Sequence, residues 1–180
     1  VDLLEKEFQI DLKIISGGNS ANYDWFKSSQ NVGRINNLRV GESILLGCET
    51  VGRKAIPGLH TGAFQLIAEV IESKKKPSLP SGEICQDAFG NVPGFLDRGI
   101  RQRVIIALGR QDIPVSSLKS IDQLKVIGSS SDHIILDGEN HNLEVGDEIR
   151  FNLDYSGLLA TMTSPFVIKQ FTDSNAHVAV

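Results

Sequence analysis

A short run of small and polar residues near the start of the chain has the chemistry of a phosphate-binding turn. Ser16, Gly17 and Gly18 follow an apolar segment, and Asn19 and Ser20 come next. Glycines let the backbone approach an anion closely, and the N–H groups at the start of a helix point toward it. A serine hydroxyl donates one more hydrogen bond. The same residues also fit an ordinary capped turn, because asparagine and serine are preferred at helix starts.

A second segment, residues 35–47, places an arginine and a glycine at the end of the next apolar run (Ile-Asn-Asn-Leu-Arg-Val-Gly-Glu-Ser-Ile-Leu-Leu-Gly). Together with the asparagine-serine turn, it resembles the alanine racemase-like enzymes that use pyridoxal 5'-phosphate (PLP), in particular their alanine/ornithine racemase branch. In that fold the cofactor sits in the mouth of a (β/α)8 barrel. The resemblance implies that Asn19, Ser20 and the backbone around Gly41 and Glu42 bind the phosphate.

The resemblance also implies that Arg39 contacts the pyridine nitrogen of the cofactor. A guanidinium group stays charged and only donates hydrogen bonds, so a nitrogen that faces it must accept and is held unprotonated. The cofactor then withdraws less charge from the substrate carbanion, which limits side reactions such as transamination. The alternative is that Arg39 forms a salt bridge at the protein surface.

The resemblance continues to the end of the chain, where residues 104–113 look like the strand and turn that deliver a residue into the active site of the second subunit. In alanine racemases that turn reads Gly-Tyr-Ala-Asp, and the tyrosine is the acid/base on one face of the substrate. Here it reads Gly109-Arg110-Gln111-Asp112. Because an arginine cannot act as a base near neutral pH, either another residue is the second proton relay, or the substrate and the reaction differ.

Asp132 and His133 are candidates for the substrate pocket. They lie in residues 128–137, which resemble the Ser-Met-Asp-Gln segment that lines the pocket from the partner subunit. A carboxylate there would suit a basic side chain such as that of ornithine, and a histidine can shuttle protons near neutral pH. The alternatives are a turn cap for Asp132 and a backbone-bonded imidazole at a strand edge for His133. The turn at Gly146-Asp147 is expected to be structural.

The elements that position these groups differ between the two parts of the chain. Residues 1–47 alternate helical spacing with compact apolar runs, which is typical of an α/β protein with a parallel sheet. From about residue 60 onward, short apolar runs alternate with Gly, Pro, Asp and Asn, which predicts an all-β domain of six to eight strands. The predicted helices are 2–9 and 21–29, and the predicted strands are 12–15, 35–39, 43–46, 64–73, 103–108, 124–127, 133–136, 148–153 and 166–168.

Lys74, Lys75, Lys76 and Pro77 are expected to form a solvated turn that ends the first strand of the β-domain. The segment that follows, up to residue 99, is rich in loop-forming residues.

Composition and charge exclude several classes of protein. The chain has 180 residues, of which 41% are hydrophobic and 22% charged, as in a typical soluble globular protein. A formal net charge of -4 argues against a nucleic-acid partner. Cys48 and Cys85 have no metal-binding spacing, so we expect free thiols in a reducing cytoplasm and no metal site. The apolar runs are too short to span a membrane, and no signal segment opens the sequence.

The predicted fold is mainly β with a short α/β segment. Residues 1–56 would be the last strand and helix units of the PLP-binding (β/α)8 barrel, and residues 57–180 the barrel-like C-terminal β-domain. A whole (β/α)8 barrel needs roughly 250 residues, and none of Lys6, Lys13 and Lys27 has the setting of the Schiff-base lysine. We therefore expect a fragment that is inactive by itself.

The predicted activity of the whole protein is the racemisation of an amino acid in a homodimer with shared active sites, by removal of the Cα proton and its return to the other face. One alternative is a fold-related PLP aldolase or dehydratase. Such enzymes commonly bind a metal through His and Cys or Asp, and no His-x-Cys pair occurs in the sequence. The other alternative is a non-enzymatic β-domain for dimerisation or binding, which would leave the phosphate-binding residues without a purpose.

Overall fold

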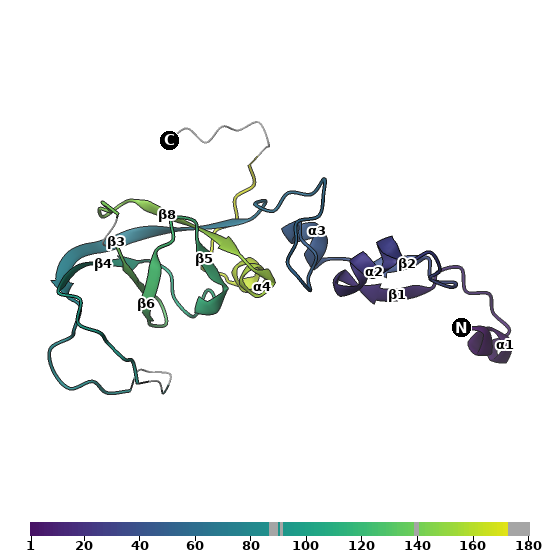
Figure 1. The fold of residues 1–180 in the computed structure, drawn as a ribbon, viewed down its shortest axis with the longest axis horizontal. Coiled ribbons are helices and arrows are strands. Elements are labelled where there is room, and N and C mark those ends of the chain that lie inside the picture. The colour runs from purple at the N-terminus through teal and green to yellow at the C-terminus, as the bar shows by residue number, and fades with distance from the viewer. Residues whose placement is uncertain (87–89, 91, 139–140, 173–180) are drawn as a thin grey trace. The chain divides into compact units, whose positions relative to one another are not determined.

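The structure is a computed structural model that describes residues 1–86, 90, 92–138 and 141–172. The chain divides into two compact units, Val1–Phe64 and Gln65–Val180. In Figure 1 the first unit is coloured purple to blue, and the second runs from teal to yellow. In the described part of the chain, no helix combines the length and the apolar character needed to cross a membrane.

The first unit contains two short parallel strands and several short helical segments (Figure 1). A parallel pair of strands needs a crossover connection, and the helical segments after the first strand supply it. The helices predicted over 2–9 and 21–29 are confirmed. The elements are α1 (Asp2–Phe8), β1 (Ser16–Asn19), the 3-10 helix η1 (Ser20–Asn22), α2 (Tyr23–Ser28), β2 (Asn37–Arg39) and α3 (Glu42–Leu46).

The strand predicted over 12–15 is wrong, because the paired strand begins only at Ser16. The backbone N–H of Ile15 donates to the side chain of Asn36 at 2.9 Å instead of to a strand. The ladder begins where Ser16 pairs with Asn37. The glycine-rich run that the sequence assigns to a turn is therefore β1 itself.

The strand predicted over 43–46 is also wrong, because this segment is the helix α3. Gly41 is the N-cap residue, and Gly47 has the left-handed backbone conformation (φ 66°) that commonly ends a helix. Ser43 and Leu46, three positions apart, form the buried face of this short helix. Two flanking glycines thus outweigh the apolar run that predicted a strand.

The first unit leaves most of its apolar side chains uncovered. Neither α1 nor α2 has a buried residue, and Leu3 is 83% exposed. Among the described residues of this unit, the buried hydrophobic side chains are Leu46 and Ile56. Ionic contacts hold α1 instead: Arg34 bonds to Glu5 at 2.6 and 2.8 Å and lowers the pKa of Glu5 to about 2. This unit therefore has almost no core of its own.

The second unit is a six-stranded antiparallel sheet in the order β5-β8-β3-β4-β7-β6, curled into a nearly closed barrel (Figure 1). The first strand of this unit, β3, is 13 residues long, so that it pairs with β8 at its start and with β4 further along. This arrangement confirms the mainly β fold class. The elements are β3 (Gln65–Pro77), β4 (Ile100–Ile106), η2 (Val115–Ser117), β5 (Leu118–Ser120), β6 (Lys125–Ser129), β7 (Ile134–Asp137), β8 (Glu148–Leu153) and α4 (Tyr155–Thr163).

The core of the second unit comes from alternating residues of these strands. In β3 every second residue is buried over its first half, and β4, β7 and β8 show the same alternation where they are paired. The large side chains with at most 1% exposure are those of Phe151, Ile106, Ile113, Ile134, Leu136, Ile149, Val70 and Val104.

The turn predicted at the lysine triplet is wrong, because residues 74–76 lie inside β3. Two of the lysines stand opposite arginines of β4, and like charges opposite each other destabilise a sheet. Two carboxylates offset this repulsion. Glu72 contacts Lys74 and Lys76 at 2.6 and 2.5 Å, and Asp137 on β7 lies within 3.1 to 3.5 Å of the two arginines. Charge pairing thus lets β3 continue through the triplet.

The end of the described chain also differs from the prediction. Residues 166–168 are not a strand, and the helix α4 and the short strand β5 were not predicted from the sequence. Asp154 caps α4 by accepting a hydrogen bond from the backbone N–H of Gly157 at 2.9 Å. The turn predicted at Gly146-Asp147 is confirmed, with Gly146 at φ 98° and the Asp147 carboxylate accepting from a backbone N–H at 2.8 Å.

Candidate active site

Ser20 is the centre of the segment that the sequence assigns to phosphate binding. Its side chain is buried, and the backbone N–H groups of Gly41 and Ser43 both donate to its Oγ atom at 3.2 Å. The two segments meet because β1 and β2 are parallel neighbours, so the residues that follow each strand lie at the same edge. The residues around Ser20 and those around Gly41 therefore form one cluster.

The hydrogen bonds at this cluster leave hydroxyl protons that a phosphate could accept. A serine hydroxyl has two acceptor sites and one donor. Both acceptor sites of Ser20 are used by N–H groups, so the proton of Ser20 is what remains. The Oγ atom of Ser43 is also buried and has no hydrogen-bond partner among the described residues. Since phosphate oxygens are acceptors, the unused donors of these two serines fit a phosphate.

The side chains of two other residues predicted to bind the phosphate have hydrogen-bond or ionic partners within the chain. The side chain of Asn19 accepts from the backbone N–H of Ala21 at 3.0 Å and caps η1, as in the capped-turn alternative. The carboxylate of Glu42 forms an ion pair with Arg53, whose pKa it raises. Because this carboxylate is paired, the predicted phosphate contact of Glu42 rests on its backbone, as the resemblance implies.

The two glycines of β1 serve packing in this structure. A Cβ atom on Gly17 would lie 2.4 Å from Cδ1 of Ile35, and one on Gly18 would lie 2.5 Å from Oδ1 of Asn22. The space beside both glycines is thus filled by side chains of the protein.

Arg39 ends β2 and is exposed, and its Nη1 atom donates to the Oγ atom of Ser16 at 2.8 Å. Among the described residues, Arg39 forms no ion pair. The structure therefore does not show the surface salt bridge that was the alternative for Arg39. A hydroxyl partner leaves the full positive charge of the guanidinium at the end of β2, two residues before Gly41. The group can therefore donate to a ring nitrogen or to another acceptor.

The second unit brings the other predicted site residues together at the turn between β6 and β7. The Nε atom of Arg110 donates to the Oγ atom of Ser129 at 2.7 Å, and its backbone N–H donates to the carbonyl of Ser130 at 3.1 Å. The backbone N–H of Gln111 donates to the carbonyl of Ser131 at 2.9 Å. Arg110 is therefore attached to the segment that carries Asp132.

Asp132 and His133 are in contact within this turn. The Nδ1 atom of His133 lies 3.1 Å from Oδ1 of Asp132, and the hydroxyls of Ser130 and Ser131 donate to the same oxygen at 3.1 and 3.2 Å. These contacts, with Ser130 the largest contributor, lower the pKa of Asp132 below its usual value. The carboxylate is therefore charged at neutral pH.

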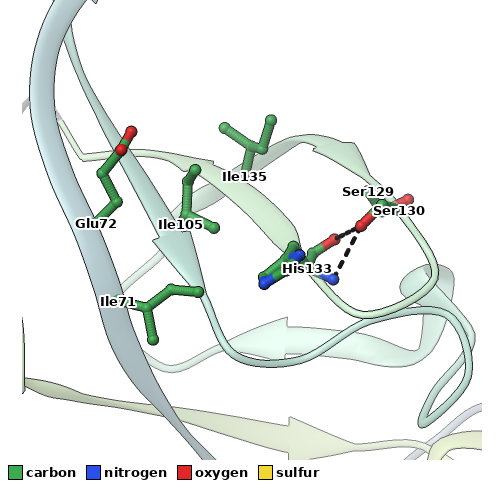
Figure 2. Close-up of a pocket in the computed structure, with 7 residues that line it drawn as sticks. All are labelled: Ile71, Glu72, Ile105, Ser129, Ser130, His133 and Ile135. Atoms are coloured by element: carbon green, nitrogen blue, oxygen red, sulfur yellow. Dashed lines mark hydrogen bonds between the residues drawn. The ribbon is translucent and has the colours of Figure 1, made fainter.

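A cavity of about 430 Å³ lies beside this turn (Figure 2). Figure 2 shows the His133 ring extending from the turn toward the isoleucine side chains of the neighbouring strands. The hydroxyl of Ser130 bonds to the backbone of His133 at the rim. The size of the cavity suits a small molecule. It is lined by Ile71, Glu72, Ile105, Ser129, Ser130, His133 and Ile135.

Gly109 allows the two segments of this site to approach each other. A Cβ atom at this position would lie 2.2 Å from the carbonyl oxygen of Ser131 and 2.3 Å from the backbone N and Cα atoms of Asp132. These are backbone atoms, which cannot move aside as a flexible side chain can. Any residue larger than glycine must therefore push the turn away from Arg110.

We expect Gly109→Ala to destabilise the protein by about 1–3 kcal/mol, because the added methyl group overpacks a close backbone contact. Gly128→Ala is the matched control, since its Cβ atom would meet only Cδ1 of Ile135 at an ordinary 3.8 Å. Urea denaturation of both variants gives the comparison. Equal stability of the two variants would contradict the close approach.

Sequence reasoning did not assign a role to Ser43 or to Ser129. Ser43 is the second residue of α3, after the N-cap Gly41, so no capping signal marks it in the sequence. No such signal separates Ser129 from the serines that follow it. Among the described residues, no group of three or more His, Cys, Asp and Glu side chains is arranged to hold a metal ion.

Solved alanine racemases share the fold of this chain. The alanine racemase from Acinetobacter baumannii aligns with 91% of this chain and 49% of its own length, with a TM-score of 0.55 and 20% sequence identity. The second unit corresponds to the C-terminal domain of alanine racemases. No family model matches the chain.

Two curated relatives narrow the class. An ornithine racemase from Acetoanaerobium sticklandii is 46% identical over 172 residues, which are 94% of this chain and 49% of that protein. A lysine racemase from Thermotoga maritima is 43% identical over 173 residues, which are 95% of this chain and 49% of that protein. The chain thus spans about half the length of the curated relatives it matches. Over nearly its whole length the chain is thus similar to alanine racemase-like proteins, and a match to about half of their length fits their C-terminal portion.

Proposed function

We propose that the chain is the C-terminal portion of a PLP-dependent amino-acid racemase, and that the cluster around Ser20 holds the phosphate of the cofactor. The observation that carries the proposal is the convergence of two backbone N–H groups on the buried Ser20 hydroxyl, in a chain 46% identical to an ornithine racemase. When bound, PLP makes the Cα proton of an amino acid acidic enough to be removed near neutral pH.

The chain's own residues have distinct parts in this proposal. Ser20 and Ser43 donate their hydroxyl protons to phosphate oxygens, with the backbone of Gly41 and Glu42 beside them. Asn19 fixes the turn that carries Ser20. Arg39 donates to the pyridine nitrogen and keeps it unprotonated. His133 lines the substrate pocket, and Arg110 and Asp132 lie in the segments that adjoin it.

We propose an amino acid with a basic side chain as the substrate. The two curated relatives are named for ornithine and lysine, which both carry a second amino group. The charged carboxylate of Asp132, beside a cavity with an isoleucine wall, supports this choice. An aliphatic chain packs against the isoleucines, and a carboxylate attracts the ammonium group at its end.

We also propose that the whole protein has two domains and is active as a homodimer, as the sequence predicts. Residues 1–56 would be the last units of the barrel that holds the cofactor, and residues 57–180 the β-domain. The active protein would be a cytoplasmic homodimer, in which the β-domain of each subunit contributes to the partner's site. The chain by itself would be inactive, because none of Lys6, Lys13 and Lys27 has the setting expected of the Schiff-base lysine.

The test is a substrate panel on the full-length protein loaded with PLP. Single enantiomers of ornithine, lysine and alanine are incubated, and the products are separated on a chiral column. We expect interconversion of ornithine or lysine to be faster than that of alanine. Cleavage of a β-hydroxy amino acid in place of any racemisation would support the aldolase alternative instead.

A further inference from the structure

The proposed racemase needs a proton carrier on each face of the substrate, and the turn expected to supply one of them carries Arg110. An arginine stays protonated near neutral pH and cannot accept the Cα proton. If the proposed function holds, another residue of this chain must be the proton carrier on that face of the substrate.

Three ionisable side chains other than Arg110 lie in the two adjoining segments, residues 109–112 and 129–133. Asp112 is buried, and its oxygens accept from the backbone N–H of Gly109 and from the hydroxyl of Ser164, both at 3.2 Å. It is therefore held inside the second unit. Asp132 is charged and its Oδ1 atom accepts from neighbours, which makes it a poor base. His133 remains.

The contacts of Asp132 fix the orientation of His133. Oδ1 of Asp132 is held by two serine hydroxyls and lies 3.1 Å from Nδ1 of the imidazole. The backbone of His133 is fixed as well, since its N–H donates to Oγ of Ser130 at 3.0 Å. A carboxylate at Nδ1 selects the tautomer with the proton on Nδ1, so the lone pair lies on Nε2.

The imidazole is directed at the cavity of about 430 Å³ (Figure 2). Nε2 is the ring nitrogen farther from the backbone, and Figure 2 shows the ring extending toward the isoleucine wall. Glu72, at the same cavity, has both carboxylate oxygens paired with lysines of its own strand. A basic ring nitrogen thus faces a space of the right size, at the turn to which Arg110 is attached.

We propose that His133 is the acid/base residue on one face of the substrate, and that Asp132 is its positioning residue. In one direction the Cα–H bond breaks, an Nε2–H bond forms, and the electron pair stays with Cα. The second proton carrier, on the opposite face and outside this chain, then gives up its proton to Cα, which inverts the centre. In the other direction the imidazolium of His133 returns its proton to Cα.

The first test reads the imidazole directly and does not depend on activity. In the 180-residue chain, long-range nitrogen–proton NMR correlations of His133 at alkaline pH should show the Nδ1–H tautomer. Asp132→Asn should shift the ring toward the Nε2–H tautomer. The exposed His60 should look the same in both proteins. A His133 tautomer that Asp132→Asn leaves unchanged overturns the positioning role.

The second test follows exchange of the Cα proton in the full-length holoenzyme in D2O. His133→Asn should lower racemisation of ornithine or lysine at least about 100-fold. One enantiomer should still exchange its Cα proton, because the carrier on the other face is intact, while exchange of the opposite enantiomer is lost. Asp132→Asn should lower racemisation to a smaller extent, and His60→Gln should leave it unchanged.

The outcomes separate this inference from the proposed function. If the wild-type holoenzyme neither racemises nor exchanges any amino acid, the proposed function fails and His133 has no such role. If the wild type racemises and His133→Asn stays within threefold of it, the inference alone fails. An equal loss of exchange for both enantiomers would indicate a structural role of His133 and overturns the proposal as well.

Discussion

Ser43→Ala is expected to stabilise the ligand-free protein and, at the same time, to weaken its affinity for PLP about tenfold or more. The hydroxyl of Ser43 is buried without a hydrogen-bond partner among the described residues, so its replacement by hydrogen removes a desolvated polar group. In the complex, the same hydroxyl would donate to a charged phosphate oxygen, and such a bond contributes about 1.5–3 kcal/mol. Thermal unfolding without ligand and fluorescence titration with PLP measure the two effects in the full-length protein.

Thr50 provides a matched control for this prediction. Its Oγ1 atom is the other buried hydroxyl without a partner among the described residues, and no phosphate contact is expected there. Thr50→Val should stabilise the protein in a similar way but leave PLP affinity unchanged. Pyridoxal, which lacks the phosphate, should bind wild type and Ser43→Ala equally. A loss of pyridoxal affinity as large as that of PLP would place Ser43 away from the phosphate.

The second large effect is a contrast in stability between the two units. Residues 65–180 made alone should unfold cooperatively in urea and protect their strand amides from hydrogen exchange, because the sheet encloses its own core. Residues 1–64 made alone should exchange at nearly unprotected rates, since Leu46 and Ile56 are the buried hydrophobic side chains described in that unit.

Two phenylalanines give the control for the second unit. Phe151 is fully buried in β8, and Phe151→Ala should cost residues 65–180 about 3–5 kcal/mol of stability. Phe166 is 70% exposed, and Phe166→Ala should have little effect. Strong amide protection in residues 1–64 alone would contradict the view that this unit depends on the rest of a barrel.

The parts of the fold that the sequence predicts are those with a strong local pattern. The strand predicted over 148–153 is β8 with the same bounds, because apolar and polar residues alternate there after a clear turn. The meeting of the segments around Ser20 and Gly41 was also within reach of the sequence, since two short apolar runs separated by a helical stretch predict neighbouring parallel strands. Parallel pairing of β1 and β2 then brings Ser20 and Gly41 together.

The errors lie where contacts distant in sequence outweigh the local pattern. The lysine triplet reads as a turn because repulsion among the lysines is local, whereas the carboxylate of Asp137 comes from another strand. The helix α4 is only nine residues long, and its small residue Gly157 packs against Ser117 and Ile113. The orientation of His133 by Asp132 was out of reach as well, because two serine hydroxyls place that carboxylate.

The most direct test of the central claim is a single NMR experiment on the full-length holoenzyme. One enantiomer of ornithine is incubated in D2O, and the Cα proton signal and the enantiomeric composition are followed together. The account predicts that deuterium replaces the Cα proton as the opposite enantiomer appears, and that Ser43→Ala needs more PLP to reach the same rate. A holoenzyme that binds PLP but leaves the Cα protons of ornithine, lysine and alanine unexchanged would contradict it.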